Sequence, residues 1–203
     1  MPRESVADNQ RAVADYERTA REYVGTVDGR PSASAEALHQ LAQAVGLGGP
    51  VLEIGSGPGW DADALETFGI DVHRTDAASA FCEFQAGRGK RCDRLDVLSD
   101  TLECRYGGAM MLCVLQHFDR PQLDAALRSL AGALHAGGAL LLMYPEGDDD
   151  VWEHGAAGDY RVVRWTAAAL DAHLARAGFT VAWEEARVGR GGTWRTVLAR
   201  RRD

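Results

Sequence analysis

A short apolar run that leads directly into three alternating glycines, VLEIGSGPGW over residues 51–60, is the feature that most constrains how this chain folds. Gly55, Gly57 and Gly59 allow backbone angles that other residues avoid, and they lack the Cβ atom that would hold a ligand at a distance. In open parallel sheets, ligands bind in the crevice beyond the carboxyl ends of the strands. We therefore expect a buried first strand, a ligand site at the glycine loop, and a helix over 60–68.

The rest of the chain alternates between strand-like and helix-like segments, which predicts a mostly parallel sheet with helices on both faces. Further strands are expected at 70–76, 91–97, 108–117, 139–144, 179–185 and 193–200, and further helices at 79–86, from Asp119 to the Gly137–Gly138 pair, and at 166–177. A short connection joins the last two strands, so the final strand should run antiparallel. The expected fold class is therefore α/β, a Rossmann-like seven-stranded sheet.

The 203 residues, 46% of them hydrophobic, are enough to bury the core of one domain. Amphipathic helices expected at 9–24 and 35–46 precede the first strand, so residues 1–48 are interpreted as a helical cap and residues 49–203 as the core. The acidic, glycine-rich segment 146–160 follows the fifth strand. It is either a lid insertion over the site or a solvated loop, and its aspartates could attract a cationic acceptor or a metal ion.

The formal net charge of −8 argues against a broad nucleic-acid-binding face. The polar N-terminal residues lack the apolar core of a secretion signal, and no apolar stretch approaches the length of a membrane span. We expect a cytoplasmic protein without a membrane partner. The four cysteines stand at wide spacings without a CxxC pair, which favours reduced thiols and no metal site.

The spacing of the glycines separates two classes of cofactor site. A dinucleotide-binding fingerprint has the form GxGxxG, and Trp60 stands where its third glycine belongs. The chain has instead ExGxGxG, from Glu53 to Gly59. With this motif, the acidic end of the second strand at Asp76 and the order of the later elements, residues 51–200 resemble the class I S-adenosylmethionine-dependent methyltransferases.

The resemblance implies S-adenosylmethionine as cofactor and S-adenosylhomocysteine as product. In that family, the carboxylate after strand two binds both ribose hydroxyls, which points to Asp76, and an aspartate after strand three contacts the adenine amine, which points to Asp96. Asp76 could otherwise be a solvated strand end, and Asp96 part of an acidic surface. The expected cofactor-binding residues are Glu53, Gly55, Ser56, Gly57, Gly59, Asp61, Asp76, Ala77, Asp96, Val97, Leu112 and Cys113.

The expected reaction is methyl transfer to oxygen or nitrogen of a small molecule, in which positioning can supply much of the rate. A general base is needed only if the accepting atom carries a proton, and His117 is the candidate, unless it is a structural histidine. The acceptor pocket is expected to include Tyr16, Tyr23, Tyr144, Glu146 and His154. The alternatives are a non-catalytic partner subunit of the same fold and, less favoured by Trp60, an NAD-dependent oxidoreductase.

Overall fold

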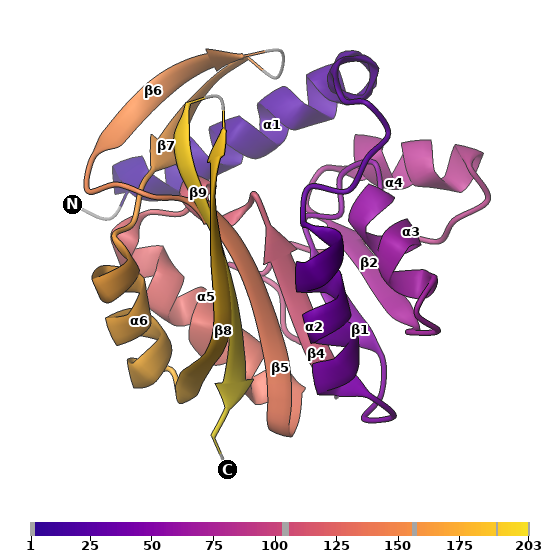
Figure 1. Ribbon diagram of the computed structural model, residues 1–203. Helices are drawn as coiled ribbons and strands as arrows, with labels where there is room; N and C mark the ends of the chain where they lie inside the picture. The colour runs from indigo at the N-terminus through magenta and orange to yellow at the C-terminus, as the bar shows by residue number, and fades with distance from the viewer. Residues whose placement is uncertain (1–2, 103–105, 156–157, 190, 203) are drawn as a thin grey trace.

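A seven-stranded sheet in the order β3-β2-β1-β4-β5-β9-β8 forms the centre of the molecule (Figure 1). The computed structural model describes residues 3–102, 106–155, 158–189 and 191–202. The strands of the sheet are β1 (Val51–Ile54), β2 (Val72–Asp76), β3 (Asp93–Arg94), β4 (Tyr106–Leu112), β5 (Leu134–Pro145), β8 (Phe179–Gly189) and β9 (Gly192–Arg201). The strands from β3 to β5 pair in parallel, and β9 runs antiparallel to both of its neighbours. The predicted fold class and the antiparallel final strand are confirmed.

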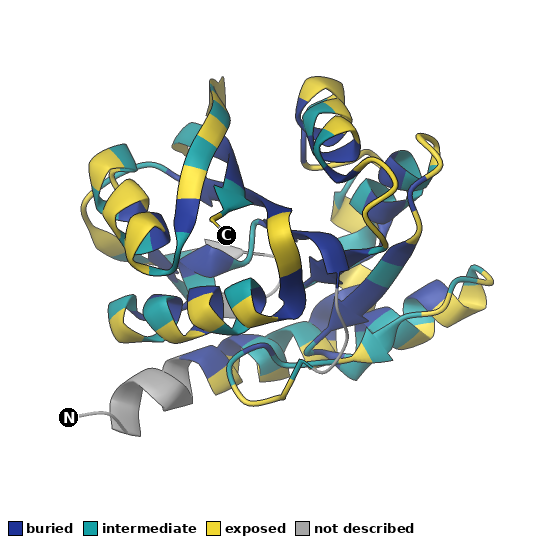
Figure 2. Cartoon of the chain, turned by 90° about the horizontal axis from the view of Figure 1, so that it is seen from below, coloured by how far each residue is buried: buried dark blue, intermediate teal, exposed yellow. Residues whose placement is uncertain are grey.

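Helices cover both faces of this sheet and bury its strands between them (Figure 2). They are α1 (Arg3–Thr26), α2 (Ala35–Val45), α3 (Trp60–Glu66), α4 (Ser79–Gly87), α5 (Arg120–Ala133) and α6 (Ala167–Arg176), with a 3-10 helix η1 (Leu115–His117). Successive residues of β5 point to opposite faces, so Leu140 and Leu142 pack with the layer of α5 and α6, whereas Leu141 packs with the layer of α2 and α3. Central strands buried on both sides explain the continuous apolar run of β5.

The start of α5 follows the sequence prediction, but its end does not. Asp119 forms a capping box with Gln122, in which each side chain bonds the other residue's backbone. The helix was expected to continue to the Gly137–Gly138 pair, yet it ends at Ala133. Leu134 already belongs to β5, where it is opposite Tyr106 and fully buried. Pairing with the neighbouring strand therefore replaces the last helical turn.

The fourth strand is shorter than its sequence suggests. We expected a strand over 108–117, but β4 ends at Leu112, the last residue paired with β5. Cys113 then adopts a positive φ of 57°, which is rare for a residue other than glycine, and the chain continues into η1. His117 consequently lies on a 3-10 turn and not at the end of a strand. Strained backbone of this kind clusters at functional sites.

The acidic segment after β5 forms a β-hairpin of β6 (Asp150–Gly155) and β7 (Gly158–Val163). The hairpin lies beside α1, near the edge of the sheet where β1, β2 and β4 end (Figure 1), and β7 contacts both α1 and η1. Asp150 forms ion pairs with Arg120 at 3.0 Å and Arg161 at 2.6 Å, and Asp149 pairs with Arg164 at 3.3 Å. Arginines of the chain itself therefore compensate two of the aspartates that were expected to attract a cation.

One pair of cysteines departs from the expected reduced thiols. Cys82 in α4 and Cys92 just before β3 form a disulfide, with their Cα atoms 4.8 Å apart, whereas the Cys113 thiol is free. The fold brings α4 and the start of β3 together, which wide sequence spacing could not reveal. Among the described helices, none is both long and apolar enough to cross a membrane.

Candidate active site

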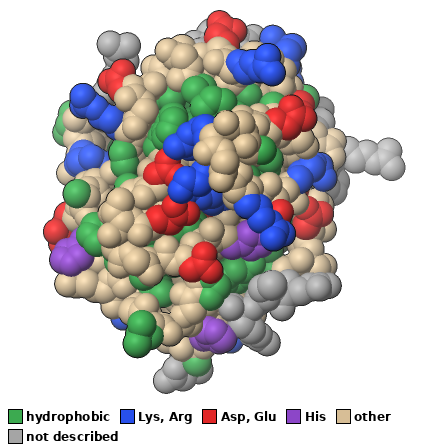
Figure 3. Space-filling view, turned by 90° about the vertical axis from the view of Figure 1, so that its right-hand side faces the viewer, with side chains coloured by type: hydrophobic (Ala, Val, Ile, Leu, Met, Phe, Trp, Pro, Cys, Tyr) green, Lys and Arg blue, Asp and Glu red, His purple; other side chains and the backbone are tan. Residues whose placement is uncertain are grey.

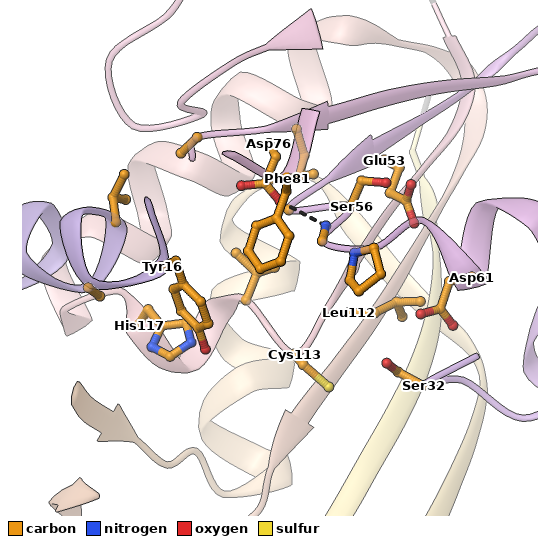
Figure 4. Close-up of a pocket in the computed structure, with 18 of the residues that line it drawn as sticks. Tyr16, Ser32, Glu53, Ser56, Asp61, Asp76, Phe81, Leu112, Cys113 and His117 are labelled. Atoms are coloured by element: carbon orange, nitrogen blue, oxygen red, sulfur yellow. Dashed lines mark hydrogen bonds between the residues drawn. The ribbon is translucent and has the colours of Figure 1, made fainter. Parts of the chain in front are cut away.

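A cavity lies at the carboxyl ends of β1, β2 and β4, between these strands and α1 (Figure 4). Its empty space amounts to about 1120 Å³ when the open mouth is included. It brings together eleven of the twelve predicted cofactor-binding residues: Glu53, Gly55, Ser56, Gly57, Asp61, Asp76, Ala77, Asp96, Val97, Leu112 and Cys113. Gly59 lies outside it.

The three glycines of the loop share a backbone conformation but differ in their surroundings. All have positive φ, at 68° for Gly55, 53° for Gly57 and 86° for Gly59. A Cβ on Gly55 would collide with the Val114 side chain, and one on Gly59 would lie 2.7 Å from Arg74 and from Gln85. A Cβ on Gly57 would meet no atom within 4 Å. Gly57 is thus the glycine that faces open space, whereas the other two make room for the protein's own side chains.

Asp76 is held at the end of β2 with both carboxyl oxygens engaged. Oδ2 accepts a hydrogen bond from the Gly57 N–H at 2.8 Å, the dashed line of Figure 4, and Oδ1 accepts one from the Ala78 N–H at 2.9 Å. Burial raises the pKa of this carboxyl to about 6, although the two N–H groups oppose the shift. Each oxygen keeps a free lone pair, so the side chain is oriented to accept further hydrogen bonds from a vicinal diol.

Glu53 presents an unpaired carboxyl oxygen at the wall of the cavity. The side chain is 3% exposed, and its Oε2 has no hydrogen-bond partner among the described residues. Burial raises its pKa to about 8, and a hydrogen bond with the Ser56 hydroxyl opposes this shift. A buried, unpaired carboxyl oxygen is costly unless a ligand completes it. An ammonium group such as that of S-adenosylmethionine fits this position.

Asp61 and Asp96 contact the cavity but also stabilise loops. Asp61 Oδ1 accepts a hydrogen bond from the Ala33 N–H at 2.9 Å, so this side chain ties the segment before α2 to the start of α3. Burial raises its pKa. Asp96 Oδ1 accepts one from the Leu98 N–H at 3.0 Å and closes the turn after β3. Each residue therefore combines a structural role with a position on the cavity wall.

His117 lines the cavity from η1 with one nitrogen unpaired. Its Nδ1 is buried and has no hydrogen-bond partner among the described residues. Burial lowers the pKa of the imidazole to about 4, and a hydrogen bond with the Arg161 backbone opposes the shift. Since Nδ1 is unpaired, that bond engages Nε2, and a neutral ring keeps a lone pair on Nδ1. The Asn9 amide donates to the His117 carbonyl oxygen at 3.4 Å.

Aromatic rings surround His117 at one end of the cavity, where Figure 4 shows it beside Tyr16. Tyr16 contacts His117 with ring centroids 5.7 Å apart and lies stacked on Tyr160 at 6.4 Å. Tyr23 and Phe81 complete the cluster. Burial raises the pKa of Tyr16 and raises that of Tyr23 to about 12, so both phenols stay neutral.

The remaining residues predicted for the acceptor pocket lie elsewhere. Tyr144 is fully buried in the core layer of α5 and α6, and Glu146 forms an ion pair with Arg195 at 2.8 Å. Neither lines the cavity. The side chain of His154 is outside the described part of the structure. The tyrosines of α1 and β5 had looked equivalent in sequence, but only those of α1 reach the site.

The sequence did not lead us to predict several of the residues that line the cavity. Asn9, Ser32, Phe81 and Val114 all line it. Phe81 occupies an apolar position of a short helix and looks like an ordinary core residue, although its place five residues after Asp76 could have suggested proximity. Asn9 is a buried polar residue near the start of α1, and nothing in the local sequence marks it.

Cys113 is unsuited to ionic chemistry at this site. Burial raises the pKa of its thiol to about 12, so the sulfur stays protonated near neutral pH. Within the described residues, no group of three or more His, Cys, Asp or Glu side chains could hold a metal ion. The chemistry on the cavity wall therefore comes from two buried carboxyl groups, one neutral imidazole and aromatic rings.

The fold of this chain resembles those of solved methyltransferases. Among solved structures, the chain resembles the Burkholderia thailandensis 1,6-didemethyltoxoflavin-N1-methyltransferase, with a TM-score of 0.72 and 22% identity over 100% of this chain and 91% of that one. It resembles DhpI in complex with S-adenosylhomocysteine at a TM-score of 0.74 and 19% identity, over 96% and 97% of the two chains. For the glycopeptide N-methyltransferase MtfA with sinefungin the TM-score is 0.67 at 15% identity, over 88% and 90%.

These identities are low, so the likenesses show a shared fold. A search among curated proteins found no match. The sequence model of a family described as "Methyltransferase domain" matches residues 27–183, which is most of the chain and includes the glycine loop, Asp76 and His117. The chain therefore belongs to the methyltransferase-domain family, and it shares its fold with solved structures that hold S-adenosylhomocysteine.

Proposed function

We propose that the protein methylates a nitrogen or oxygen atom of a small, uncharged molecule, with His117 as the general base. The observation that carries this proposal is the buried, unpaired Nδ1 of His117, a residue that lines the cavity and whose imidazole is neutral. S-adenosylmethionine, when bound, supplies an activated methyl group on a sulfonium and leaves as S-adenosylhomocysteine. Cofactor-binding roles are assigned to Asp76 for the ribose, Glu53 for the ammonium group and Asp96 for the adenine.

His117 would remove the proton that the accepting atom loses. As the methyl carbon bonds to the acceptor, its former bonding electrons stay on sulfur, and the N–H or O–H proton moves to Nδ1. The low pKa of His117 keeps Nδ1 free to accept this proton across the neutral pH range. From there, the proton would leave to solvent when product departs.

The surroundings of His117 favour an uncharged acceptor. Tyr16 and Tyr23 are neutral phenols, and Cys113 is a neutral thiol. Asp149 and Asp150 pair with arginines of the chain, which weakens the earlier idea that this segment attracts a cation. Aromatic side chains favour a flat ring on which they can stack. The likeness to enzymes described as N-methyltransferases supports nitrogen as the accepting atom.

In this proposal α1 and the β6–β7 hairpin form the cap over the acceptor end. Tyr16 and Tyr23 on α1 and Tyr160 on β7 would contact the acceptor, which agrees with their ring contacts around His117. A small acceptor is preferred over nucleic acid because the net charge is −8. The cytoplasmic location expected from the sequence stays a prediction.

Two titrations in a calorimeter test the cofactor assignment, one with S-adenosylhomocysteine and one with NAD⁺. We expect heat only with S-adenosylhomocysteine. Binding of NAD⁺ alone would favour an oxidoreductase, and binding of neither would favour a non-catalytic subunit. Transfer of a labelled methyl group to small N–H heterocycles, compared between wild type and His117→Gln, then tests the base. Equal rates in the two proteins would remove His117 from that role.

A further inference from the structure

The glycine loop has a second side, opposite the cavity, where side chains of the protein bind its backbone. The carbonyl oxygens of three consecutive residues each accept a hydrogen bond from a different side chain. The Gln85 amide donates to Gly57 at 2.8 Å, Arg88 donates to Pro58 at 2.7 Å, and Arg74 donates to Gly59 at 3.1 Å. We call Arg74, Gln85 and Arg88 the brace.

Gln85 is the centre of the brace. It is fully buried, and its Nε2 also donates to the Ser56 hydroxyl oxygen at 2.9 Å, while its Oε1 accepts from Arg74 at 3.3 Å. Because the Ser56 oxygen already accepts from Gln85, its own hydrogen is free to point toward Glu53. Figure 4 shows the Ser56 hydroxyl directed at the Glu53 carboxyl. Gln85 therefore reaches the cofactor site through one intervening side chain.

Ion pairs anchor the two arginines of the brace. Arg74 is 2% exposed and pairs with Asp63 at 2.8 Å and Glu66 at 2.6 Å. Arg88 also pairs with Asp63, and its guanidinium lies 4.0 Å from the centre of the Trp60 ring. On the side of the molecule that carries α3 and α4, basic and acidic side chains alternate near the centre (Figure 3).

The third glycine of the motif belongs to this side of the loop. A side chain on Gly59 would displace both Arg74 and Gln85, whereas Gly59 itself does not line the cavity. The glycines of the motif therefore meet two separate requirements. Gly57 leaves open space on the cavity side, and Gly59 allows the brace to pack closely against the loop.

We propose that Gln85, supported by Arg74 and Arg88, is a positioning residue of the cofactor site, which fixes the Ser56 hydroxyl and the outward direction of the loop carbonyls. Gln85 does not line the cavity, so it would act on the cofactor through its hydrogen bonds with the Gly57 backbone and with Ser56. This inference rests on the proposed cofactor roles of Glu53 and the glycine loop. It extends the site to α4, which the motif itself does not include.

The test compares Gln85→Leu, Arg88→Met and Lys90→Met with the wild type by calorimetric titration with S-adenosylhomocysteine. Lys90 is the matched control, because it pairs with Glu66 at 2.7 Å and Asp63 at 3.4 Å in the same charged cluster. Within the described part of the structure, its side chain donates no hydrogen bond to the loop backbone. We expect Kd to rise about tenfold in Gln85→Leu and about threefold in Arg88→Met, since each loses hydrogen bonds that shape the loop. Lys90→Met should bind as the wild type does.

Circular dichroism at the titration temperature establishes that each variant is folded, and the pH profile of binding separates positioning from general destabilisation. The hydrogen bond from the Ser56 hydroxyl lowers the pKa of Glu53. In Gln85→Leu this hydroxyl is no longer directed at Glu53, so the pH at which affinity for S-adenosylhomocysteine is half-maximal should rise. If Gln85→Leu does not fold, the pair Arg88→Met and Lys90→Met decides. Equal Kd values for the brace variants and the wild type, or an equal loss in Lys90→Met, would overturn the brace alone. A wild type that binds no S-adenosylhomocysteine would overturn the proposed cofactor roles as well.

Discussion

Two pairs of carboxyl groups flank the same glycine loop, and their environments shift their pKa values in opposite directions. On the cavity side, burial raises the pKa of Glu53 to about 8 and that of Asp76 to about 6. On the brace side, hydrogen bonds from arginine and lysine outweigh burial, so the pKa values of Asp63 and Glu66 are lowered. The carboxyl groups on the brace side are therefore paired within the protein, whereas those on the cavity side need a ligand to offset their burial.

This difference in pKa distinguishes carboxyl groups that stabilise the loop from those that could bind a ligand. Asp63 and Glu66 are ionised and paired, so they stabilise the loop without any further partner. Glu53 is shielded from water, and its hydrogen bond with the Ser56 hydroxyl offsets the effect of burial only in part. Groups that remain costly in the folded protein are candidates for ligand binding, because a ligand can supply what the protein lacks. Acidic residues close together in sequence, such as Asp61 and Asp63, can therefore have separate roles.

The largest effect is expected for His117, whose unpaired nitrogen is the clearest mark of the cavity side. His117→Gln should lower kcat by roughly 100-fold or more, as loss of a general base does, and leave the Kd of S-adenosylhomocysteine nearly unchanged. Rapid-quench or steady-state assays with an accepted substrate measure this. His173→Gln is the control, because His173 pairs with Asp124 away from the cavity at 2.7 Å. A similar loss in both variants would indicate a structural role.

Asp76→Ala should weaken binding of S-adenosylhomocysteine by more than tenfold, about 1.4 kcal/mol or more, through loss of hydrogen bonds to the ribose. Calorimetric titration gives the value. Asp93→Ala is the matched control, since Asp93 also belongs to this edge of the sheet but pairs with His73 and Arg91. An unchanged Kd in Asp76→Ala would remove Asp76 from the site.

Glu53 predicts a pH dependence of cofactor affinity. With a pKa of about 8 in the free protein, Glu53 is mostly protonated at pH 7 and must lose its proton to pair with an ammonium group. Affinity for S-adenosylhomocysteine should therefore rise between pH 6 and 8, by up to about tenfold per pH unit. Titrations across this range check the slope. A flat profile in the wild type, or the same slope in Glu53→Gln, would contradict the assignment.

The smallest effect is expected for Tyr144, which shares burial with the cavity residues but not their position. Its hydroxyl has no hydrogen-bond partner among the described residues, so Tyr144→Phe removes an unsatisfied buried group. The melting temperature should stay the same or rise slightly, and kcat and Kd should not change. Thermal unfolding and a standard activity assay measure both. A marked loss of activity would place Tyr144 in the acceptor site after all.

The sequence by itself determined the elements that depend on local chemistry. The glycine loop and the starts of α5 at Asp119 and of α6 at Thr166 all lie where the pattern predicted them. The second strand was predicted to end at the acidic Asp76, and β2 does end there. These features depend on turns, caps and strand ends, which a few neighbouring residues specify.

Only the tertiary structure decided which side chains share the site and which groups lack a partner. The 108–117 segment reads as one strand, yet Cys113 turns the chain because pairing with β5 ends at Leu112. Tyr16 and Tyr144 look alike in sequence, but one lines the cavity and the other fills the core. Gln85 reaches the loop only because α4 packs behind it. Burial and long-range hydrogen bonds depend on residues far apart in the chain, so no local pattern can encode them.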